Sequence, residues 1–209
     1  MLNRLICLIL GYFIGAIIQT GFWIGKFNHI DIRDYGSGNA GTTNTMRTLG
    51  KKAGFITYFM DAFKSCITAI IIHFIYGSNS DISEMLLILY GGFGVVLGHN
   101  FPFYLGFKGG KGVATSLGVL LMTNWQIGLI CLVFALVLMA LSKMVSLGSV
   151  GAAILFPVLV LFIHTNFTVS EGSSYLIYSI ILAVIVAFNH RSNIKRILNG
   201  TENKLSFKK

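Results

Sequence analysis

Two segments of the chain combine closely spaced glycines with hydroxyl, amide and cationic side chains. The first, residues 36–47, reads GSGNAGTTNTMR. Glycines let a backbone turn tightly and bring its N–H groups close to an anion. Short polar side chains follow, and Arg47 adds a planar guanidinium that suits a phosphate. A flexible polar loop is the alternative, but it needs neither the Thr-Thr-Asn cluster nor the arginine. The segment therefore predicts an anion site that includes Ser37, Gly38, Asn39, Gly41, Thr43, Asn44 and Arg47.

The second segment, residues 98–115, reads GHNFPFYLGFKGGKGVAT. Its Gly109-Gly110-Lys111-Gly112 stretch is similar to a nucleotide-binding P-loop, but two positions depart from that pattern. Leu105 stands where the first glycine is required, and Gly112 stands where a Ser or Thr would hold Mg²⁺. A helix that begins near Val113 would place its positive dipole end beside Lys111. The segment predicts a second anion contact and gives no support for hydrolysis of a nucleoside triphosphate.

The glycines of the first segment also match G-x-G-x-x-G, which is typical of dinucleotide-binding folds. That fold requires a strand before the loop, a helix after it and an acid about 20 residues later. Asp61 has this spacing but lies within an apolar stretch. We therefore reject a dinucleotide site and retain only backbone amides that hold phosphate oxygens.

A third polar segment, residues 189–204, reads NHRSNIKRILNGTENK. If it is helical, His190 and Asn193 share one face, and its isoleucines and Leu198 form an apolar stripe. A basic helix at the membrane interface explains most of these cations. It does not require His190 or Asn193, so these two are candidate site residues.

The elements that must position these segments are membrane helices. The chain has 209 residues, is 55% hydrophobic and only 11% charged, whereas a soluble domain carries about 25% charged residues. We expect one membrane-embedded domain over residues 1–209. A membrane helix needs about 20 apolar residues, and the predicted spans are Leu5–Ile24, Ala53–Tyr76, Met85–Leu97, Gly128–Leu141, Gly148–Ile163 and Tyr175–Phe188, with Val113–Thr123 as a short seventh or a re-entrant element.

The distribution of Lys and Arg decides between six and seven spans. The first and third connections, Lys143 and the tail after residue 189 carry most of the cations. The intervening connections contain no Lys or Arg, and their charged residues are Asp81, Glu84 and Glu171. Cytoplasmic loops carry the excess of positive charge. Seven spans place every cationic segment on one side, so we expect an all-α integral membrane protein with the N-terminus outside and the C-terminus in the cytoplasm. Since this topology accounts for the net charge of +9, nucleic acid is not expected as a partner.

Ionisable residues inside the predicted spans are few. Asp61 and Lys64 are three residues apart and can pair with each other, either for a function or as a structural pair. His73 is expected near the outer end of its span. The three cysteines form no C-x-x-C pair, so neither a metal nor a cofactor is expected.

Taken together, the three polar segments and Asp61-Ala62-Phe63-Lys64 resemble the acyl-phosphate-dependent glycerol-3-phosphate acyltransferases of bacteria, the PlsY family. The matching stretches are long and follow one another in the family's order along the whole chain. Ser65 is a departure, since the family commonly has Gly at this position. The resemblance implies an enzyme of the bacterial cytoplasmic membrane that acylates the 1-hydroxyl of glycerol 3-phosphate. The products would be lysophosphatidic acid and phosphate. Its partners would be acyl-phosphate, membrane lipids and a soluble enzyme that makes the donor.

The resemblance also implies roles for individual residues. Ser37, Arg47, Lys111, His190 and Asn193 would bind the phosphates, and the backbone from Gly38 to Asn44 and around Gly109, Gly110 and Gly112 would surround the substrate. Either His190 or the substrate phosphate would accept the hydroxyl proton. The alternative function is a transporter for a phosphorylated metabolite.

Overall fold

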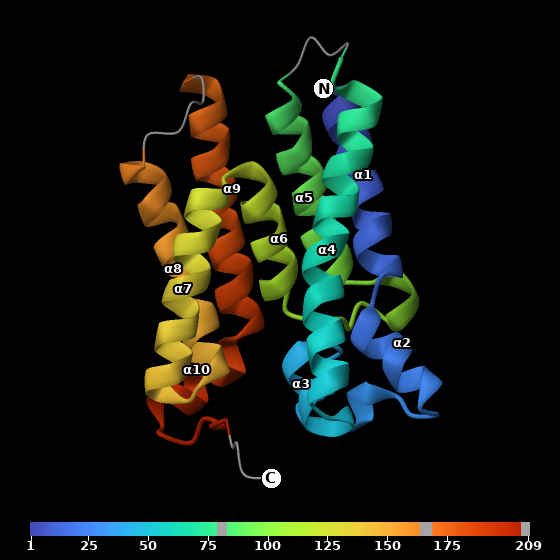
Figure 1. Cartoon of the computed structure of the whole chain (residues 1–209), viewed down its shortest axis with the longest axis vertical. Helices are drawn as coiled ribbons and strands as arrows, with labels where there is room; N and C mark the ends of the chain where they lie inside the picture. Colours follow the sequence, from blue (N-terminus) through green and yellow to red (C-terminus); the bar gives the residue numbers. More distant parts are fainter. Residues whose placement is uncertain (79–82, 164–168, 206–209) are drawn as a thin grey trace. The chain divides into compact units, whose positions relative to one another are not determined.

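The computed structural model describes residues 1–78, 83–163 and 169–205, and within these ranges all regular structure is helical. The helices form two compact units, Met1–Thr123 and Asn124–Lys209 (Figure 1). The expected helical class is confirmed, while one domain over the whole chain stays a prediction.

The first unit contains α1 (Leu2–Ile17), α2 (Thr20–Phe27), η1 (Ile32–Asp34), α3 (Thr42–Leu49), α4 (Lys51–Tyr76), α5 (Glu84–Asn100), η2 (Phe103–Leu105) and α6 (Val113–Thr123). The second contains α7 (Trp125–Ser142), α8 (Val145–Phe162), α9 (Val169–Asn189) and α10 (Arg191–Leu198).

Six helical segments in the described ranges are long and apolar enough to cross a membrane: Leu2–Phe27, Lys51–Tyr76, Glu84–Leu105, Trp125–Ser142, Val145–Phe162 and Gly172–Asn189. They correspond to the six longer predicted spans and extend most of them by a few residues. The short element Val113–Thr123 is α6, whose 11 residues rise about 16 Å. A hydrocarbon core is about 30 Å thick, so α6 by itself is too short to span it.

The first predicted span is not continuous. The chain leaves the helical conformation at Ile18 and Gln19, where ψ is 73° and 72°, and α2 departs from the direction of α1 (Figure 1). The carbonyls that lose helical partners at a break must find other donors in an apolar surrounding. The Gln19 side chain supplies one of them, because its Nε2 donates to the Gly15 carbonyl at 3.1 Å. The predicted span Leu5–Ile24 therefore matches the candidate span Leu2–Phe27, but it consists of two helices, and a polar side chain satisfies part of the break between them.

Helices α1 and α5 pack with almost no space between their backbones. A side chain at Gly94 would collide with the carbonyl of Leu8, and one at Gly98 would collide with the carbonyl of Tyr12. Small residues allow this close approach between membrane helices. The packing fixes the C-terminal end of α5, from which the loop with the second glycine cluster emerges.

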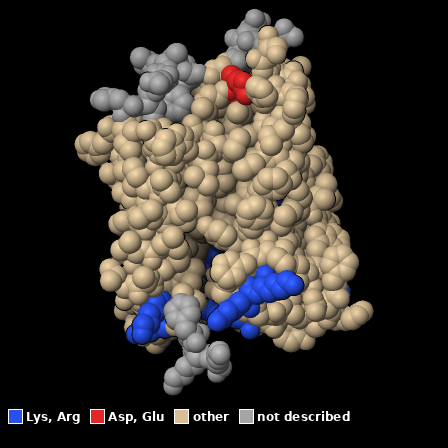
Figure 2. Space-filling model, viewed as in Figure 1, with Lys and Arg blue, Asp and Glu red and all other residues tan. Residues whose placement is uncertain are grey.

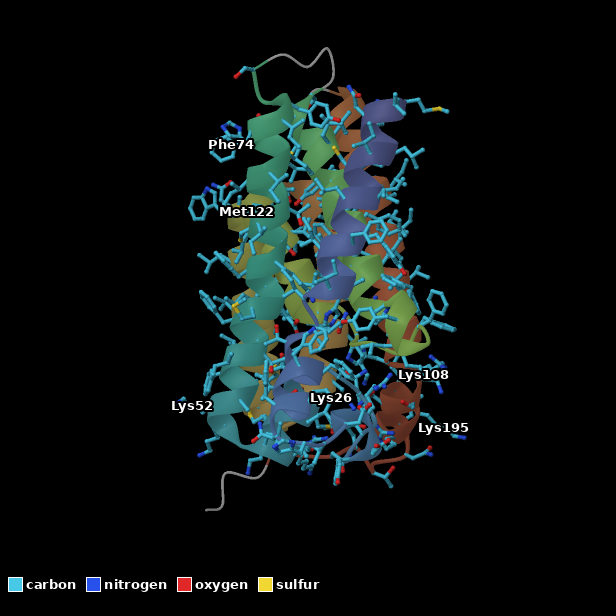
Figure 3. The ribbon with its side chains drawn as sticks, turned by 90° about the vertical axis from the view of Figure 1, so that its right-hand side faces the viewer. Lys26, Lys52, Phe74, Lys108, Met122 and Lys195 are labelled. Atoms are coloured by element: carbon cyan, nitrogen blue, oxygen red, sulfur yellow. The ribbon has the colours of Figure 1, made fainter. Side chains whose placement is uncertain are left out.

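Cationic side chains of the first unit gather at the end where its polar loops lie. Figure 2 shows Lys and Arg at the lower end of the face in view. In Figure 3, Lys26, Lys52 and Lys108 lie at this end, and Phe74 and Met122 lie toward the other. In the second unit, the Leu205 N–H donates to the Lys143 carbonyl, so the α7–α8 connection and the tail lie together. Of the acids predicted in the outer connections, Glu84 pairs with His73 at 2.9 Å, whereas Asp81 and the Glu171 side chain lie outside the described residues.

Candidate functional site

The two glycine-containing loops of the first unit lie side by side. The Asn39 amide donates to the Gly109 carbonyl at 3.1 Å, and a side chain at Gly41 would lie 3.9 Å from the Cα of Gly110. Arg33 of η1 adds a second link by donating to the Leu105 carbonyl of η2 at 2.8 Å. The structure thus brings together two segments that are about 70 residues apart in sequence, as expected for one site.

Asn44 holds the first loop in shape. Its Oδ1 accepts the Ser37 N–H at 2.8 Å, and its Nδ2 donates to the carbonyls of Ile32 and Tyr35 at 2.9 and 3.0 Å. The side chain is 1% exposed. Gly36 and Gly38 have φ of 61° and 69°, a conformation that glycine adopts without strain. Asn44, predicted to bind substrate, therefore uses its amide to set the loop conformation.

Four of the glycines predicted to surround the phosphate donate their N–H groups within the protein. Gly38 donates to the Tyr35 carbonyl, Gly41 to Asn39 Oδ1, Gly109 to the Asn100 carbonyl and Gly110 to the His99 carbonyl, at 2.9–3.1 Å. Because these four N–H groups already donate within the protein, they do not form the predicted phosphate-binding backbone. The backbone donors better suited to an anion are the N–H groups in the first turns of α3 and α6, which have no acceptor within their own helix.

These first turns carry several of the predicted residues. Thr43 and Asn44 belong to the first turn of α3, and Arg47 lies exposed in its last turn. Ser37 is also exposed, in the loop before the helix. Lys111 is partly buried, two residues before α6. The predicted start of this helix at Val113 is confirmed.

The second loop needs glycines because it passes directly over the end of α5. A side chain at Gly110 would collide with the His99 imidazole, and one at Gly109 would collide with the His99 carbonyl. Gly112 has φ of 82°, and a side chain there would lie 2.7 Å from Asn100 Oδ1. The glycines therefore fix the path of the backbone on both sides of Lys111.

We expect Gly110→Ala to lower kcat/KM by about 10–100-fold, because the loop must move away from His99 and a displacement near 1 Å in a site costs this much. Steady-state kinetics on the purified protein measure the effect. Gly106→Asn is the control: Gly106 has φ of 64° with nothing within 4 Å of an added side chain, and Asn tolerates this conformation. Equal activity of the two variants would contradict the proposed role of the packing.

Three buried polar side chains beneath this loop were missed in the sequence. Asn100 is 3% exposed, Thr115 0% and Ser116 7%. Neither amide atom of Asn100 and neither hydroxyl has a hydrogen-bond partner among the described residues. Such groups are rare in folded proteins and mark places where a further donor or acceptor is expected. The signal in the sequence was that polar residues stand at the adjoining ends of two apolar segments, Asn100 at the end of one and Thr115 and Ser116 near the start of the next.

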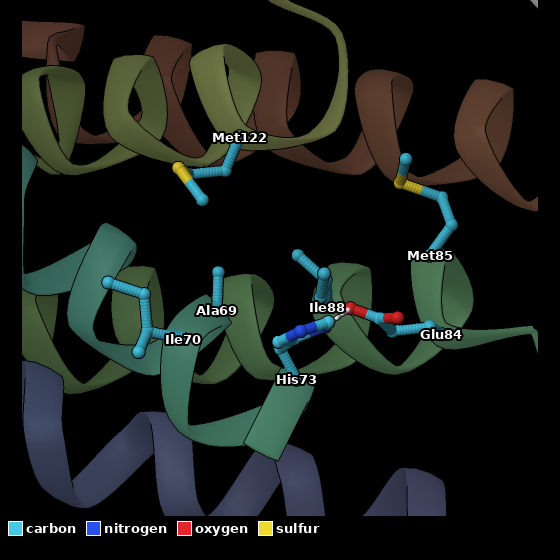
Figure 4. Close-up of a pocket in the computed structure, with 7 residues that line it drawn as sticks. All are labelled: Ala69, Ile70, His73, Glu84, Met85, Ile88 and Met122. Atoms are coloured by element: carbon cyan, nitrogen blue, oxygen red, sulfur yellow. Dashed lines mark hydrogen bonds and ion pairs between the residues drawn. The ribbon is translucent and has the colours of Figure 1, made fainter. Parts of the chain in front are cut away.

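A cavity of about 530 Å³ lies in the first unit, and its lining includes none of the predicted site residues. It is lined by His73, Glu84 and five apolar side chains from α4, α5 and α6 (Figure 4). These residues lie toward the end of the first unit opposite the loops.

In the second unit, His190 and Asn193 are both buried, at 4% and 8% exposure. His190 lies 2.8 Å through Nδ1 from the Val186 carbonyl. Since a carbonyl can only accept, Nδ1 carries a proton and donates it. Proton exchange with a substrate would therefore involve Nε2. Asn193 donates through Nδ2 to Glu202 Oε1 at 2.8 Å.

Glu202 organises the end of the second unit and was also missed. Besides Asn193, its carboxylate accepts from Ser146 at 2.9 Å and from Arg196 at 2.8 Å. Burial by itself would raise the pKa of Glu202, but these hydrogen bonds outweigh it and lower the pKa below its usual value of 4.5. Its signal in the sequence was that it is the one acid among the six cations after residue 189.

We expect Glu202→Gln to lower the free energy of unfolding by about 2 kcal/mol, because three donors lose a charged acceptor. The lowered pKa gives the sign of the pH dependence. The stabilisation by Glu202 is complete above pH 4.5 and is lost as the pH falls through the lower folded-state pKa. Thermal unfolding in detergent at several pH values tests this, with Lys204→Ala, at an exposed position, as control. Identical unfolding curves for both variants at neutral pH would contradict it.

Comparison with known proteins gives one consistent result. A family model described as glycerol-3-phosphate acyltransferase matches residues 5–200. Proteins named glycerol-3-phosphate acyltransferase from Fusobacterium nucleatum and Thermoanaerobacter sp. are 44% and 41% identical, covering 96% of this chain in each case and 97% and 94% of their own lengths.

Solved structures agree. The crystal structure of PlsY (YgiH), an integral membrane glycerol 3-phosphate acyltransferase, in its glycerol 3-phosphate form matches with a TM-score of 0.83 and 34% identity, covering 97% of this chain and 96% of that chain. The lysophosphatidic acid form matches with a TM-score of 0.81 and 33% identity, covering 97% and 95%.

Proposed function

Because the chain belongs to the glycerol-3-phosphate acyltransferase family and is an acyltransferase, we propose that its acyl donor is acyl-phosphate and its product lysophosphatidic acid. The observation that carries the proposal is the Asn39–Gly109 hydrogen bond, which joins two loops suited to phosphates. Two phosphate-bearing substrates need two such elements close together. The solved relatives were obtained with glycerol 3-phosphate and with lysophosphatidic acid, which supports this acceptor and this product.

Acyl-phosphate is a mixed anhydride with a good leaving group, so direct transfer requires no covalent enzyme intermediate. The 1-hydroxyl oxygen of glycerol 3-phosphate attacks the acyl carbon, the bond from that carbon to the phosphate oxygen breaks, and inorganic phosphate leaves. The protein must position two anions and stabilise the charge that develops. The hydroxyl proton passes to the substrate phosphate or to Nε2 of His190.

We assign the phosphate contacts to Ser37, Arg47, Lys111, His190 and Asn193, as the family resemblance implies. Arg47 is an exposed cation in the last turn of α3, and Lys111 is a partly buried cation just before α6. The N–H groups of Thr43 and Asn44 add donors at the start of α3. Gly38, Asn39, Gly41, Gly109, Gly110 and Gly112 set the loop geometry that presents these groups.

The proposed topology has seven spans with the N-terminus outside and the C-terminus in the cytoplasm, in a bacterial cytoplasmic membrane. In this topology α6 is a short span that begins at the cationic loop, and the bilayer or neighbouring helices compensate for its length. The loops would then face the cytoplasm, where a soluble enzyme would supply acyl-phosphate.

Purified protein in detergent, given acyl-phosphate and labelled glycerol 3-phosphate, tests the proposal. We expect labelled lysophosphatidic acid without any second compartment. Absence of this product, together with accumulation of glycerol 3-phosphate inside proteoliposomes, would favour the transporter. Family membership favours the enzyme.

His190→Gln separates the two proton acceptors. Glutamine keeps an amide near the position of Nε2 but cannot act as a base. If the substrate phosphate accepts the proton, as we expect, kcat falls by about tenfold or less, whereas loss of an obligatory base costs about 10²–10⁴-fold. Single-turnover rates measure the step directly. A loss above a hundredfold in a folded variant would assign the base to His190.

A further inference from the structure

A buried cluster of charged and polar groups lies in the first unit below the second glycine loop. The side chains of Lys64, Asp61 and His99 are 0%, 3% and 4% exposed. Lys64 Nζ lies 3.1 Å from Asp61 Oδ1, 2.6 Å from His99 Nδ1 and 2.9 Å from the Ile18 carbonyl. An ammonium has three N–H donors, and each finds one acceptor here. Lys64 is therefore fully hydrogen-bonded as a cation.

This arrangement determines the tautomer of His99. Because Lys64 donates to Nδ1, the imidazole accepts there and carries its proton on Nε2. Nε2 faces Gly110, where any added side chain would collide with it. The imidazole is thus oriented from below by Lys64 and lies directly against the loop residue that precedes Lys111.

Hydrogen bonds of the cluster and its neighbours also link the α1–α2 break, the end of α5 and the start of α6. Lys64 satisfies the Ile18 carbonyl at the break between α1 and α2. Gln19, from the same break, donates to the carbonyls of Gly98 and His99 at 3.3 and 3.0 Å. Ser65, next to Lys64, donates to the Thr115 carbonyl in the first turn of α6 at 2.9 Å. One short stretch of α4 is therefore bonded to the helix break, to the end of α5 and to the start of α6.

A structural ion pair alone would not require this arrangement. Buried pairs contribute little net stability, and neutral residues of similar volume often replace both partners without loss. Here Lys64 also donates to His99, which lies against the second glycine loop, and to the Ile18 carbonyl at the break between α1 and α2. The cluster has the geometry of a support for a site, which favours a functional role over a purely structural pair.

We propose that Asp61, Lys64 and His99 are positioning residues for the acyl transfer: Lys64, fixed by Asp61, orients His99, and His99 supports the Gly109–Gly112 backbone that presents Lys111. The cluster acts through the loop and does not touch the substrates. The proposal rests on the proposed role of Lys111 in phosphate binding.

The test uses a variant that removes both charges. Asp61→Asn with Lys64→Met keeps the side-chain volumes and leaves no buried charge unpaired, so the protein should still fold, with a thermal midpoint lowered only by the lost hydrogen bond from Lys64 to the Ile18 carbonyl. We expect kcat/KM to fall by about 10–100-fold, because Met cannot orient His99 and the loop shifts. A folded double variant with kcat/KM within threefold of the original protein would overturn the proposal.

Two substitutions at His99 keep the proposal testable if the double variant does not fold. Both leave the Asp61–Lys64 pair in place. His99→Asn keeps an amide near Nδ1 but nothing against Gly110, so kcat/KM should fall by about tenfold or more. His99→Gln places an amide near Nε2 and should recover part of that loss. Full activity of the Asn variant would overturn the proposal.

The matched control removes another side-chain pair that links α4 and α5, at the opposite end of these helices. His73 of α4 and Glu84 of α5 pair at 2.9 Å (Figure 4), and His73 is exposed. His73→Gln with Glu84→Gln should leave both kcat and KM unchanged. An equal loss in this variant would mean that any α4–α5 link matters, and would overturn the assignment to the cluster. Failure of the proposed function is separate, because the unaltered protein would then make no product from acyl-phosphate.

Discussion

Lys111→Ala should lower kcat by about 10³-fold while the protein stays folded. Loss of one preorganised donor in a site typically costs 10²–10³-fold, and in the proposed site Lys111 would contribute a full charge between two anionic substrates. Lys111 is partly buried just before α6, in a backbone fixed by Gly110 and Gly112. Steady-state kinetics and thermal unfolding of the purified variant measure the two effects separately.

Lys108→Ala is the matched control for Lys111. It removes a cation three residues earlier in the same loop, where the side chain is exposed (Figure 3). We expect its kcat within about threefold of the original, because exposed charges interact weakly through water. Equal losses in both variants would mean that the loop acts through its general positive potential. Full activity of Lys111→Ala would remove Lys111 from the site.

Arg47→Ala should lower kcat/KM by about 10²–10³-fold, and Arg47→Lys should recover only part of this loss. A guanidinium binds a phosphate through two parallel hydrogen bonds, whereas an ammonium acts as a point charge. Arg47 is exposed in the last turn of α3, so its removal should not lower stability. Initial rates at varied concentrations of each substrate show which phosphate it binds.

Lys52→Ala provides the comparison for Arg47. Lys52 is exposed at the start of α4, five residues further along the chain (Figure 3). It should retain the original KM for both substrates. If Arg47→Lys behaves like the unaltered protein, charge alone suffices and the bidentate contact is contradicted.

Much of the fold could be predicted because apolar segments of membrane length are visible in the sequence. Each of the six longer predicted spans matches a candidate span in the structure. The start of α6 at Val113 was also predicted, since it follows directly on a glycine-rich loop. The break at Ile18 was not predictable from local pattern, because it contains neither Pro nor Gly. It depends on Gln19 and on Lys64, which is 46 residues away in sequence.

The sequence indicated which segments could form a site, but it did not indicate their hydrogen bonds. Glycine clusters beside cations pointed to two loops, and the Asn39–Gly109 hydrogen bond shows that these loops meet; the roles of their residues stay predictions. The hydrogen-bond acceptors of the glycine N–H groups could not be inferred from the sequence. Gly109 and Gly110 donate to carbonyls of α5, which come close to them only in the folded protein. The same holds for Glu202, whose partners Ser146 and Asn193 lie on different helices.

The most direct test of the account compares two products in one reaction. Protein in detergent receives acyl-phosphate, with or without glycerol 3-phosphate, and phosphate and lysophosphatidic acid are measured from the first turnover onward. Direct transfer predicts equal amounts of both products at all times, and no burst of phosphate when the acceptor is absent. Without acceptor, a burst of phosphate equal to the enzyme concentration would show an acyl-enzyme intermediate. With acceptor, lysophosphatidic acid formed without release of phosphate would show a different acyl donor. Either result would contradict the account.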